Sequence, residues 1–163
     1  MKESILNRCR LFVDLREDDL ARLTMRAKEA KVKNKEIILR EGDGCPKNPL
    51  LYIIDKGDIK LVKKDSQGIP QKIGIMEKGN IFGVENLTGR FRGLTAYPLS
   101  YEASSDVTLY TLSNEDLKQA LSEEGYVIVA LNIAIYLSRW MRACLERCAT
   151  IEILSGYIKV ISP

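Results

Sequence analysis

The middle of the chain sets its architecture: residues 50–87 read LLYIIDKGDIKLVKKDSQGIPQKIGIMEKGNIFGVENL. This segment contains three short apolar runs, at residues 50–54, 59–62 and 73–76, and each run is followed by a turn sequence that contains Gly with Asp or Asn. Short β-rich runs separated by such turns are typical of antiparallel strands. A sheet of this kind must cover its apolar face, so we expect it to close into a roll or to pack against a helix.

The composition argues against several classes of protein. The formal net charge is only +3, which gives no reason to expect a nucleic-acid-binding or membrane-binding surface. The chain lacks the roughly 18 uninterrupted apolar residues of a membrane span, and its charged N-terminus lacks the apolar core of a secretory signal. We therefore expect a cytoplasmic protein with reduced cysteines. There is no His, which removes the commonest general base and metal ligand.

Strand and helix patterns flank the middle segment. Residues 3–27 predict one or two short helices, with Asp18 and Asp19 in a first turn where carboxylates suit the positive helix end. Residues 28–40 and 100–112 predict further strands. Residues 86–98 have no clean period and predict a loop with one helical turn. Ser113 or Asn114 then caps a short predicted helix.

The longest periodic segment, residues 125–152, predicts a single long helix. Its apolar or small side chains recur at alternating spacings of 3 and 4, the heptad pattern of a coiled-coil seam. This seam consists of Val127, Ala130, Ala134, Leu137, Met141, Cys144, Cys148 and Ile151. A second apolar row adjoins it, formed by Ile128, Leu131, Ile135 and Leu145.

A helix with two apolar rows has two partners to cover. We expect the seam to pair with a second copy across a two-fold axis and the other row to cover the chain's own sheet. The alternative is one wide apolar face buried within a monomer. Gly156 is expected to end the helix as a C-cap, and residues 157–161 have a strand-like pattern.

The order of these elements resembles the cyclic-nucleotide-binding-type effector domain of the Crp/Fnr (catabolite activator) family of bacterial transcription regulators. The resemblance covers about residues 9–150 and rests on LFVDLREDDLARL, EIILREGD, LLYIIDKGDIKLVKKDSQGIPQKIG, GNIFGVENL and SYEASSDVTLYTLSNEDL. It implies an α+β, mainly β fold: a double-stranded β-helix jelly roll with short N-terminal helices and a long C-terminal dimerisation helix. In the family, a winged helix-turn-helix that binds DNA follows.

The resemblance divides the chain into three segments. We expect residues 1–122 to form the cyclic-nucleotide-binding-like sensor domain, residues 123–152 the dimerisation helix, and residues 153–163 a tail or the start of a missing DNA-binding domain. A winged helix-turn-helix needs roughly 60–70 further residues, so DNA contact is expected only through a domain not present here. The alternative is a stand-alone sensor or dimerisation module with no DNA role.

The phosphate cassette departs from that of family members that bind cyclic AMP. Their cassette reads roughly Phe-Gly-Glu-Leu, a short gap, then Arg-Ser or Arg-Ala, with the Glu on the ribose hydroxyl and the Arg on the cyclic phosphate. Here the Phe-Gly pair at residues 82–83 is followed by Val84, and the Arg-Ser position holds the Tyr-Pro pair 97–98. Because a phosphate buried without a cation is unfavourable, we expect another effector or an empty cup, unless Arg90 or Arg92 supplies the charge.

The candidate ligand-binding residues surround this cassette. Gly79 and Gly83 could present backbone N–H groups to a ligand, or could only shape a corner of the roll. Tyr97 and Tyr101 could stack on an aromatic ligand, or could fill the core. The candidate set is Gly83, Val84, Glu85, Asn86, Tyr97 and Tyr101, and no cofactor is identified.

The cysteines offer little chemistry. Cys144 and Cys148 lie one turn apart in the seam, so a parallel dimer could form an interchain disulfide or a soft-metal site there. The simpler interpretation is that both are small apolar fillers of the seam. Only Cys9 lies near the N-terminus, where the oxygen-sensing branch of the family carries a cysteine cluster. We therefore expect no metal site and no enzyme; a cupin-type jelly-roll enzyme would need His ligands.

Overall fold

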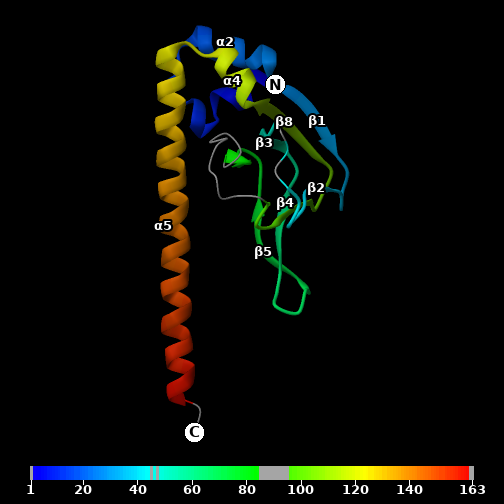
Figure 1. Cartoon of the computed structure of the whole chain (residues 1–163), viewed down its shortest axis with the longest axis vertical. Coiled ribbons are helices and arrows are strands. Elements are labelled where there is room, and N and C mark those ends of the chain that lie inside the picture. Colours follow the sequence, from blue (N-terminus) through cyan, green and yellow to red (C-terminus); the bar gives the residue numbers. More distant parts are fainter. Residues whose placement is uncertain (1, 45, 47, 85–95, 162–163) are drawn as a thin grey trace.

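The structure, a computed structural model, describes residues 2–44, 46, 48–84 and 96–161, with the backbone alone for residues 2–4, 144 and 147–161. Short helices gather at one end of a β-roll, and a single long helix runs past the roll and beyond it (Figure 1). The helices are α1 (Lys2–Asn7), η1 (Arg10–Phe12), α2 (Glu17–Arg26), α4 (Asn114–Ala120) and α5 (Glu123–Ile161). The strands are β1 (Lys28–Val32), β2 (Ile37–Leu39), β3 (Leu50–Lys56), β4 (Ile59–Lys64), β5 (Pro70–Met76), β6 (Ile81–Phe82), β7 (Ser100–Ala103) and β8 (Val107–Ser113).

The strands form two antiparallel four-stranded sheets. Sheet A has the order β1-β8-β3-β6 and sheet B the order β2-β7-β4-β5. Strands distant in sequence pair within each sheet, as in the register of Tyr52 with Phe82 and of Ile53 with Tyr110. This arrangement confirms the jelly roll with N-terminal helices and a long C-terminal helix that the sequence predicted.

Sheet A is covered on both faces by two separate apolar cores. The helix-side core joins the outer face of sheet A to the helices and contains Ile5, Leu6, Cys9, Leu11, Phe12, Leu23, Ala27, Leu51, Ile53, Ile81, Val84, Tyr110, Leu112, Leu117, Ala120 and Val129. The roll core lies between the sheets and contains Leu39, Ile54, Ile59, Phe82, Tyr97, Tyr101, Ala103, Val107 and Leu109. Alternation along a strand separates the two cores, because successive side chains point to opposite faces of a sheet.

Helix α4 begins as the sequence indicated. Ser113 is its N-cap and forms a capping box with Asp116: the Asp116 backbone N–H donates to Ser113 Oγ at 3.1 Å, and the Ser113 backbone N–H donates to Asp116 Oδ2 at 2.9 Å. Such a box satisfies two N–H groups that a helix start would otherwise leave unpaired. Strand β8 therefore passes directly into α4 without a loop.

Helix α5 uses a different face for its own domain than the sequence predicted. Val129 is buried, Ile133 and Tyr136 pack against the helix-side core, and Asn132 donates to backbone oxygens of the N-terminal segment. The row expected to cover the sheet is instead largely exposed, at Leu131, Ile135 and Leu145. That prediction was wrong because the true contact face includes Asn132 and Tyr136, whose polar atoms an apolar-only pattern passes over.

The end of α5 also differs from the prediction. The helix continues through Gly156 to Ile161, so residues 157–161 are helical and not strand-like. A single Gly costs a helix only about 1 kcal/mol relative to Ala, which a long helix tolerates. Within the described residues, none of the helices has the length and apolarity that crossing a lipid bilayer requires.

A buried carboxylate joins α2 to the start of α5. Asp19 is 1% exposed and accepts hydrogen bonds from the Ser122 backbone N–H at 2.9 Å, from Ser122 Oγ at 2.7 Å and from the Arg22 guanidinium. Ser122 Oγ in turn accepts from the Gly125 N–H at 3.1 Å. A Cβ at Gly125 would collide with the Asp19 carboxylate, so glycine is required there by close approach.

Burial alone would raise the pKa of Asp19, but the hydrogen bonds from Ser122 and the charge of Arg22 outweigh it and hold the pKa below its ordinary value. A carboxyl with a depressed folded-state pKa stabilises the fold at pH values above its unfolded-state pKa. This stabilisation is lost as the pH falls through the folded-state value. The ionised Asp19 therefore contributes fully at neutral pH.

We predict that Asp19→Asn lowers the free energy of unfolding by about 2 kcal/mol at pH 7, because the buried hydrogen bonds lose their charged acceptor. The melting temperature should fall by about 4–8 °C in a chain of this length. Asp18→Asn is the matched control, since Asp18 lies in the same helical turn and is exposed. Urea titrations across pH should show the difference between wild type and Asp19→Asn shrinking only in acid; equal losses in the two variants would contradict the role of Asp19.

Candidate ligand-binding site

Three aromatic rings are stacked inside the roll. The Phe82 ring lies between those of Tyr52 and Tyr101, with centroid separations of 4.6 Å and 4.7 Å and interplanar angles of 4° and 17°. Tyr52 and Phe82 belong to sheet A and Tyr101 to sheet B, so the stack connects the two sheets. Burial raises the pKa of Tyr52, which keeps its phenol neutral. The interior of the roll is therefore rich in aromatic rings that stack on one another, a favourable arrangement for such side chains.

The predicted ligand-binding residues fall into two groups. Tyr97 and Tyr101 are both buried and belong to the roll core with Phe82. Val84 is 2% exposed and belongs to the helix-side core, together with Ile81. The structure thus brings the two tyrosines into one core and places Val84 in the other. Glu85 and Asn86, like Arg90 and Arg92 and most of the loop predicted at residues 86–98, lie outside the described residues.

Tyr97 is held by its backbone. Its N–H donates to the Asp43 carbonyl at 2.9 Å, and its carbonyl accepts from the Gly42 N–H at 3.0 Å. Gly44 forms an isolated bridge with Ala96 beside this pair. The segment at the cassette's Arg position is therefore pinned to the turn after β2, and the side chain that it contributes to the roll core is an aromatic ring.

Two residues of the site were missed from the sequence. Tyr52 and Phe82 form most of the stack, yet neither is in the candidate set. Phe82 carried a signal, because it is the Phe of the Phe-Gly pair in the cassette. Tyr52 carried only its alternation with Ile54, and its register opposite Phe82 depends on strands far apart in the chain.

The glycines near the cassette have different requirements. Gly79 has a φ of +85° and a Cβ there would meet nothing within 4 Å, so its backbone conformation alone accounts for the glycine. Gly83 is buried and has a φ of +75°. Gly79 precedes and Gly83 follows strand β6, the two-residue strand that contains Phe82.

Helix α5 touches the site's scaffold through one polar side chain. The Tyr136 hydroxyl donates to the Ile81 carbonyl at 3.1 Å. One turn earlier, Asn132 Nδ2 donates to the carbonyls of Leu11 and Val13 at 3.2 Å and 2.9 Å. These contacts fix the helix against β6 and against the segment around η1.

The predicted dimer seam lies on exposed surface wherever its side chains are described. Val127, Ala130, Ala134, Leu137 and Met141 are all exposed. The side chains of Cys144, Cys148 and Ile151 lie outside the description. Exposed apolar residues continue around the helix at Leu131, Ile135, Trp140 and Leu145.

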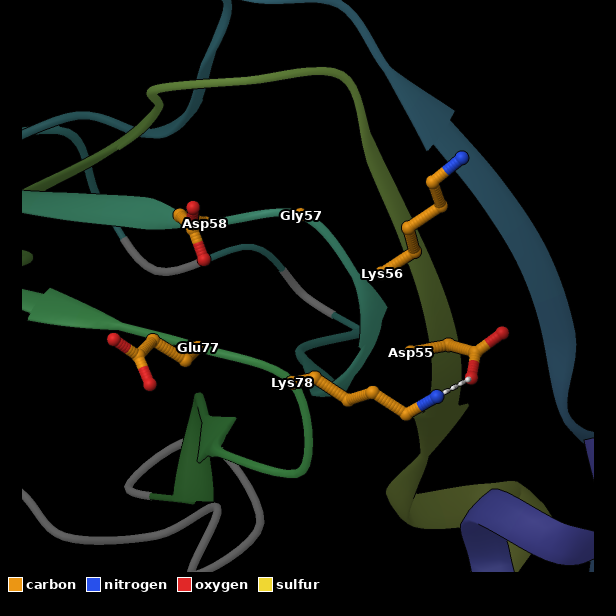
Figure 2. A pocket seen from close by; sticks show the side chains of 6 residues that line it. All are labelled: Asp55, Lys56, Gly57, Asp58, Glu77 and Lys78. Atoms are coloured by element: carbon orange, nitrogen blue, oxygen red, sulfur yellow. Dashed lines mark ion pairs between the residues drawn. The ribbon is translucent and has the colours of Figure 1, made fainter.

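A hollow lies at the ends of the hairpins, and none of the three stacked rings lines it. It has a volume of about 410 Å³ and is lined by Asp55, Lys56, Gly57, Asp58, Glu77 and Lys78. Figure 2 shows the Lys78 ammonium turned to the Asp55 carboxylate, and the two charges are 3.7 Å apart. Of the predicted site residues that the structure describes, none lines this hollow. Its mixed charges on two turns are those of an ordinary solvated surface.

Metal and thiol chemistry find no support in the described part of the chain. Among those residues, no group of three or more His, Cys, Asp or Glu side chains is placed to hold a metal ion. Cys9 is a free, buried cysteine in the helix-side core. Burial raises the pKa of its thiol to about 12, so Cys9 stays protonated and unreactive at neutral pH.

Solved structures with the same fold include bacterial regulators. The catabolite activator protein of Thermus thermophilus matches with 22% identity and a TM-score of 0.69, over 90% of this chain and 63% of that one. The N-terminal domain of a transcriptional regulator from Streptomyces coelicolor matches with 22% identity and a TM-score of 0.69, over 86% and 94%. The sensor domain of the transcriptional regulator DNR from Pseudomonas aeruginosa matches with 17% identity and a TM-score of 0.68, over 88% and 91%.

These likenesses, all below 25% identity, establish the fold, and the chain spans less than two thirds of the Thermus protein. A comparison with curated proteins gives no match. The sequence model described as the cyclic nucleotide-binding domain matches residues 29–124, which include nearly all of the roll and the whole of α4. The chain therefore belongs to the cyclic nucleotide-binding domain family, with the fold of Crp/Fnr-type sensor domains that its sequence resembles.

Proposed function

We propose that this chain is the sensing and dimerising domain of a Crp/Fnr-type transcription regulator, with an effector other than cyclic AMP. The effector binds in the roll, beside the stack of Tyr52, Phe82 and Tyr101, and the domain acts in the cytoplasm without catalysing a reaction. The observation that carries this proposal is the pair of apolar residues at the two polar positions of the cassette. Val84 stands at the Glu position and Tyr97 at the Arg position, and both are buried in apolar cores.

The electrostatic argument concerns the phosphate. A cyclic phosphate carries a full negative charge, and an isolated ion in an apolar environment loses its hydration at a cost of several kcal/mol. In the family, the cassette Arg compensates for this with a bidentate pair. Tyr97 offers a neutral phenol at that position, and its backbone groups are already bonded to Gly42 and Asp43. The aromatic stack instead favours a flat, neutral molecule.

The dimer proposal rests on the free face of α5. Met141 and Trp140 are each 58% exposed, and Val127, Leu131 and Leu145 are similarly open. Contiguous exposed apolar surface of this kind usually marks an interface. A second copy of α5 is the partner that fits, because the heptad spacing of the seam suits a two-stranded coiled coil.

The regulatory role comes from the relatives. The similar structures include two whose descriptions name transcriptional regulators and one that is a catabolite activator protein. We propose that this domain passes an effector signal through α5 to a DNA-binding domain outside this chain. An effector can do this only if it binds one arrangement of α5 more tightly than the other.

We expect cyclic AMP to leave the melting temperature of the purified domain unchanged. A ligand present at 100 times its Kd stabilises a folded protein by about 2.7 kcal/mol, or about 5–10 °C for a chain of this length. The measurement is differential scanning fluorimetry with cyclic AMP, with 5′-AMP as the ligand control and a panel of neutral aromatic metabolites beside them. A shift of that size with cyclic AMP alone would show that Val84 and Tyr97 have been misinterpreted.

We expect Leu137→Glu and Met141→Glu each to convert a dimer into monomers, because a buried seam cannot hold two unpaired carboxylates facing each other. Arg139→Glu is the control, since Arg139 is exposed on α5 and lies outside the seam row. Sedimentation velocity gives the mass of each species. A wild-type monomer, or variants that remain dimeric, would refute the seam.

A further inference from the structure

The two residues of strand β6, Ile81 and Phe82, together contact the helix-side core, the aromatic stack and helix α5. The Ile81 side chain is buried in the helix-side core, and the Phe82 ring is the middle member of the aromatic stack. Strand β6 is also the edge of sheet A, paired on one side with β3. At this edge the Ile81 carbonyl accepts the Tyr136 hydroxyl of α5 at 3.1 Å. An edge strand leaves backbone groups that need partners, and Tyr136 supplies one.

The Ile81 carbonyl is covalently joined to Phe82 through a single peptide unit. That carbonyl belongs to the peptide unit that links Ile81 to Phe82, and the unit is planar because of its partial double-bond character. A displacement of Phe82 Cα therefore carries the carbonyl oxygen with it. The ring at the centre of the stack and the acceptor for Tyr136 are thus connected through one Cα atom and one planar peptide unit.

Tyr136 also lies where α5 leaves its own domain. Val129 is 2% exposed, and Asn132 and Tyr136 bond to backbone carbonyls. The described side chains that follow, at residues 137–143, 145 and 146, are all exposed. Figure 1 shows α5 continuing past the roll from this region. The helix from Tyr136 to Ile161 is about 37 Å long at 1.5 Å per residue, so a tilt of about 5° at Tyr136 moves its end by about 3 Å.

We propose that Tyr136 is the positioning residue through which the aromatic stack sets the angle of α5. A molecule that displaces the Phe82 ring shifts the Ile81 carbonyl, and the hydrogen bond transmits that shift to the helix. The identity of such a molecule rests on the proposed function, but the contact between Tyr136 and Ile81 does not. Small shifts of this kind become large ones when a rigid element carries them to a distant end.

The test perturbs the stack without any effector and measures amide hydrogen exchange by mass spectrometry on the whole chain. Phe82→Leu removes the middle ring, and Tyr136→Phe keeps the ring of Tyr136 but removes its hydroxyl. Tyr136→Phe alone should reduce protection of residues 129–136 by about five-fold, the loss expected for one hydrogen bond. Phe82→Leu should reduce protection of the same segment in the wild-type background, and this reduction should disappear in the Tyr136→Phe background.

Helix α2 is the internal reference, because its Leu23 belongs to the helix-side core, whereas the stacked rings belong to or pack against the roll core. Val107→Ala is the matched control, since it shortens a side chain of the same roll core without altering a stacked ring. It should reduce the hydrogen-exchange protection of residues 129–136 and of α2 to the same extent. If Phe82→Leu does not fold, Tyr52→Leu replaces it, because Tyr52 is the half-buried outer ring. The proposal would be overturned if Phe82→Leu reduced the protection of α2 as much as that of residues 129–136. Additive effects of Phe82→Leu and Tyr136→Phe on protection would also overturn it.

Trp140 supplies a second readout that needs no ligand. It is the single Trp of the chain and lies one turn beyond Tyr136 on α5. Phe82→Leu should shift its emission maximum in the wild-type background and not in the Tyr136→Phe background. An identical shift in both backgrounds counts against the proposal. Because cyclic AMP binding and dimer mass are measured separately, failure of the proposed function leaves this test intact.

Discussion

The structure depends on the burial of sheet A from both sides. Strands β3 and β8 have buried side chains on each face, so removal of either covering layer would expose one whole apolar face. The two-layer rule that a sheet must cover its apolar faces then makes both the roll and the helical layer obligatory. Sheet B supplies the inner cover, while α2, α4 and the first turns of α5 supply the outer one. The long helix is therefore part of the fold before it is part of any interface.

The sequence predicted the elements whose causes are local. Turn chemistry at Gly57, Gly68 and Gly79 marked the strand ends, and each of these residues has a positive φ. The N-cap of α4 was narrowed to Ser113 or Asn114 because both residue types favour helix starts, and the structure shows that Ser113 is the cap. The predicted own-sheet face of α5 was wrong, since the contact includes Asn132 bonded to carbonyls more than a hundred residues away. The predicted helix end failed for a related reason: a weak local signal at Gly156 does not override a long helix.

The candidate site likewise has some features that follow from local sequence and others that depend on long-range contacts. The Phe-Gly pair and the tyrosines at positions 97 and 101 could be found because the family cassette has a recognisable order. The stack itself could not, because it requires Tyr52 to pair with Phe82 and Tyr101 to come across from the other sheet. The buried charge at Asp19 was likewise beyond prediction: the pattern gave a helix-start carboxylate, while its partner Ser122 lies 103 residues away. The partners of aromatic rings and buried charges are set by tertiary structure, and the spacing of residues along the sequence carries little information about them.

The contacts that hold α5 against its own domain differ in how directly they connect to the stacked rings. Val129 lies in the helix-side core, and Asn132 donates to carbonyls of the segment around η1. Tyr136 contacts β6, whose next residue is the central ring. A change confined to the roll can therefore reach α5 through the hydrogen bond between Tyr136 and the Ile81 carbonyl. With one end of the helix fixed and the contact at Tyr136 movable, the helix is expected to rotate about its fixed end.

A ligand that binds equally well to both arrangements of α5 would bind without moving the helix, since only a difference in affinity shifts an equilibrium. If the domain has the proposed sensing function, its effector must compete with Tyr52 or Tyr101 for a face of Phe82, and filling space in the roll is not sufficient.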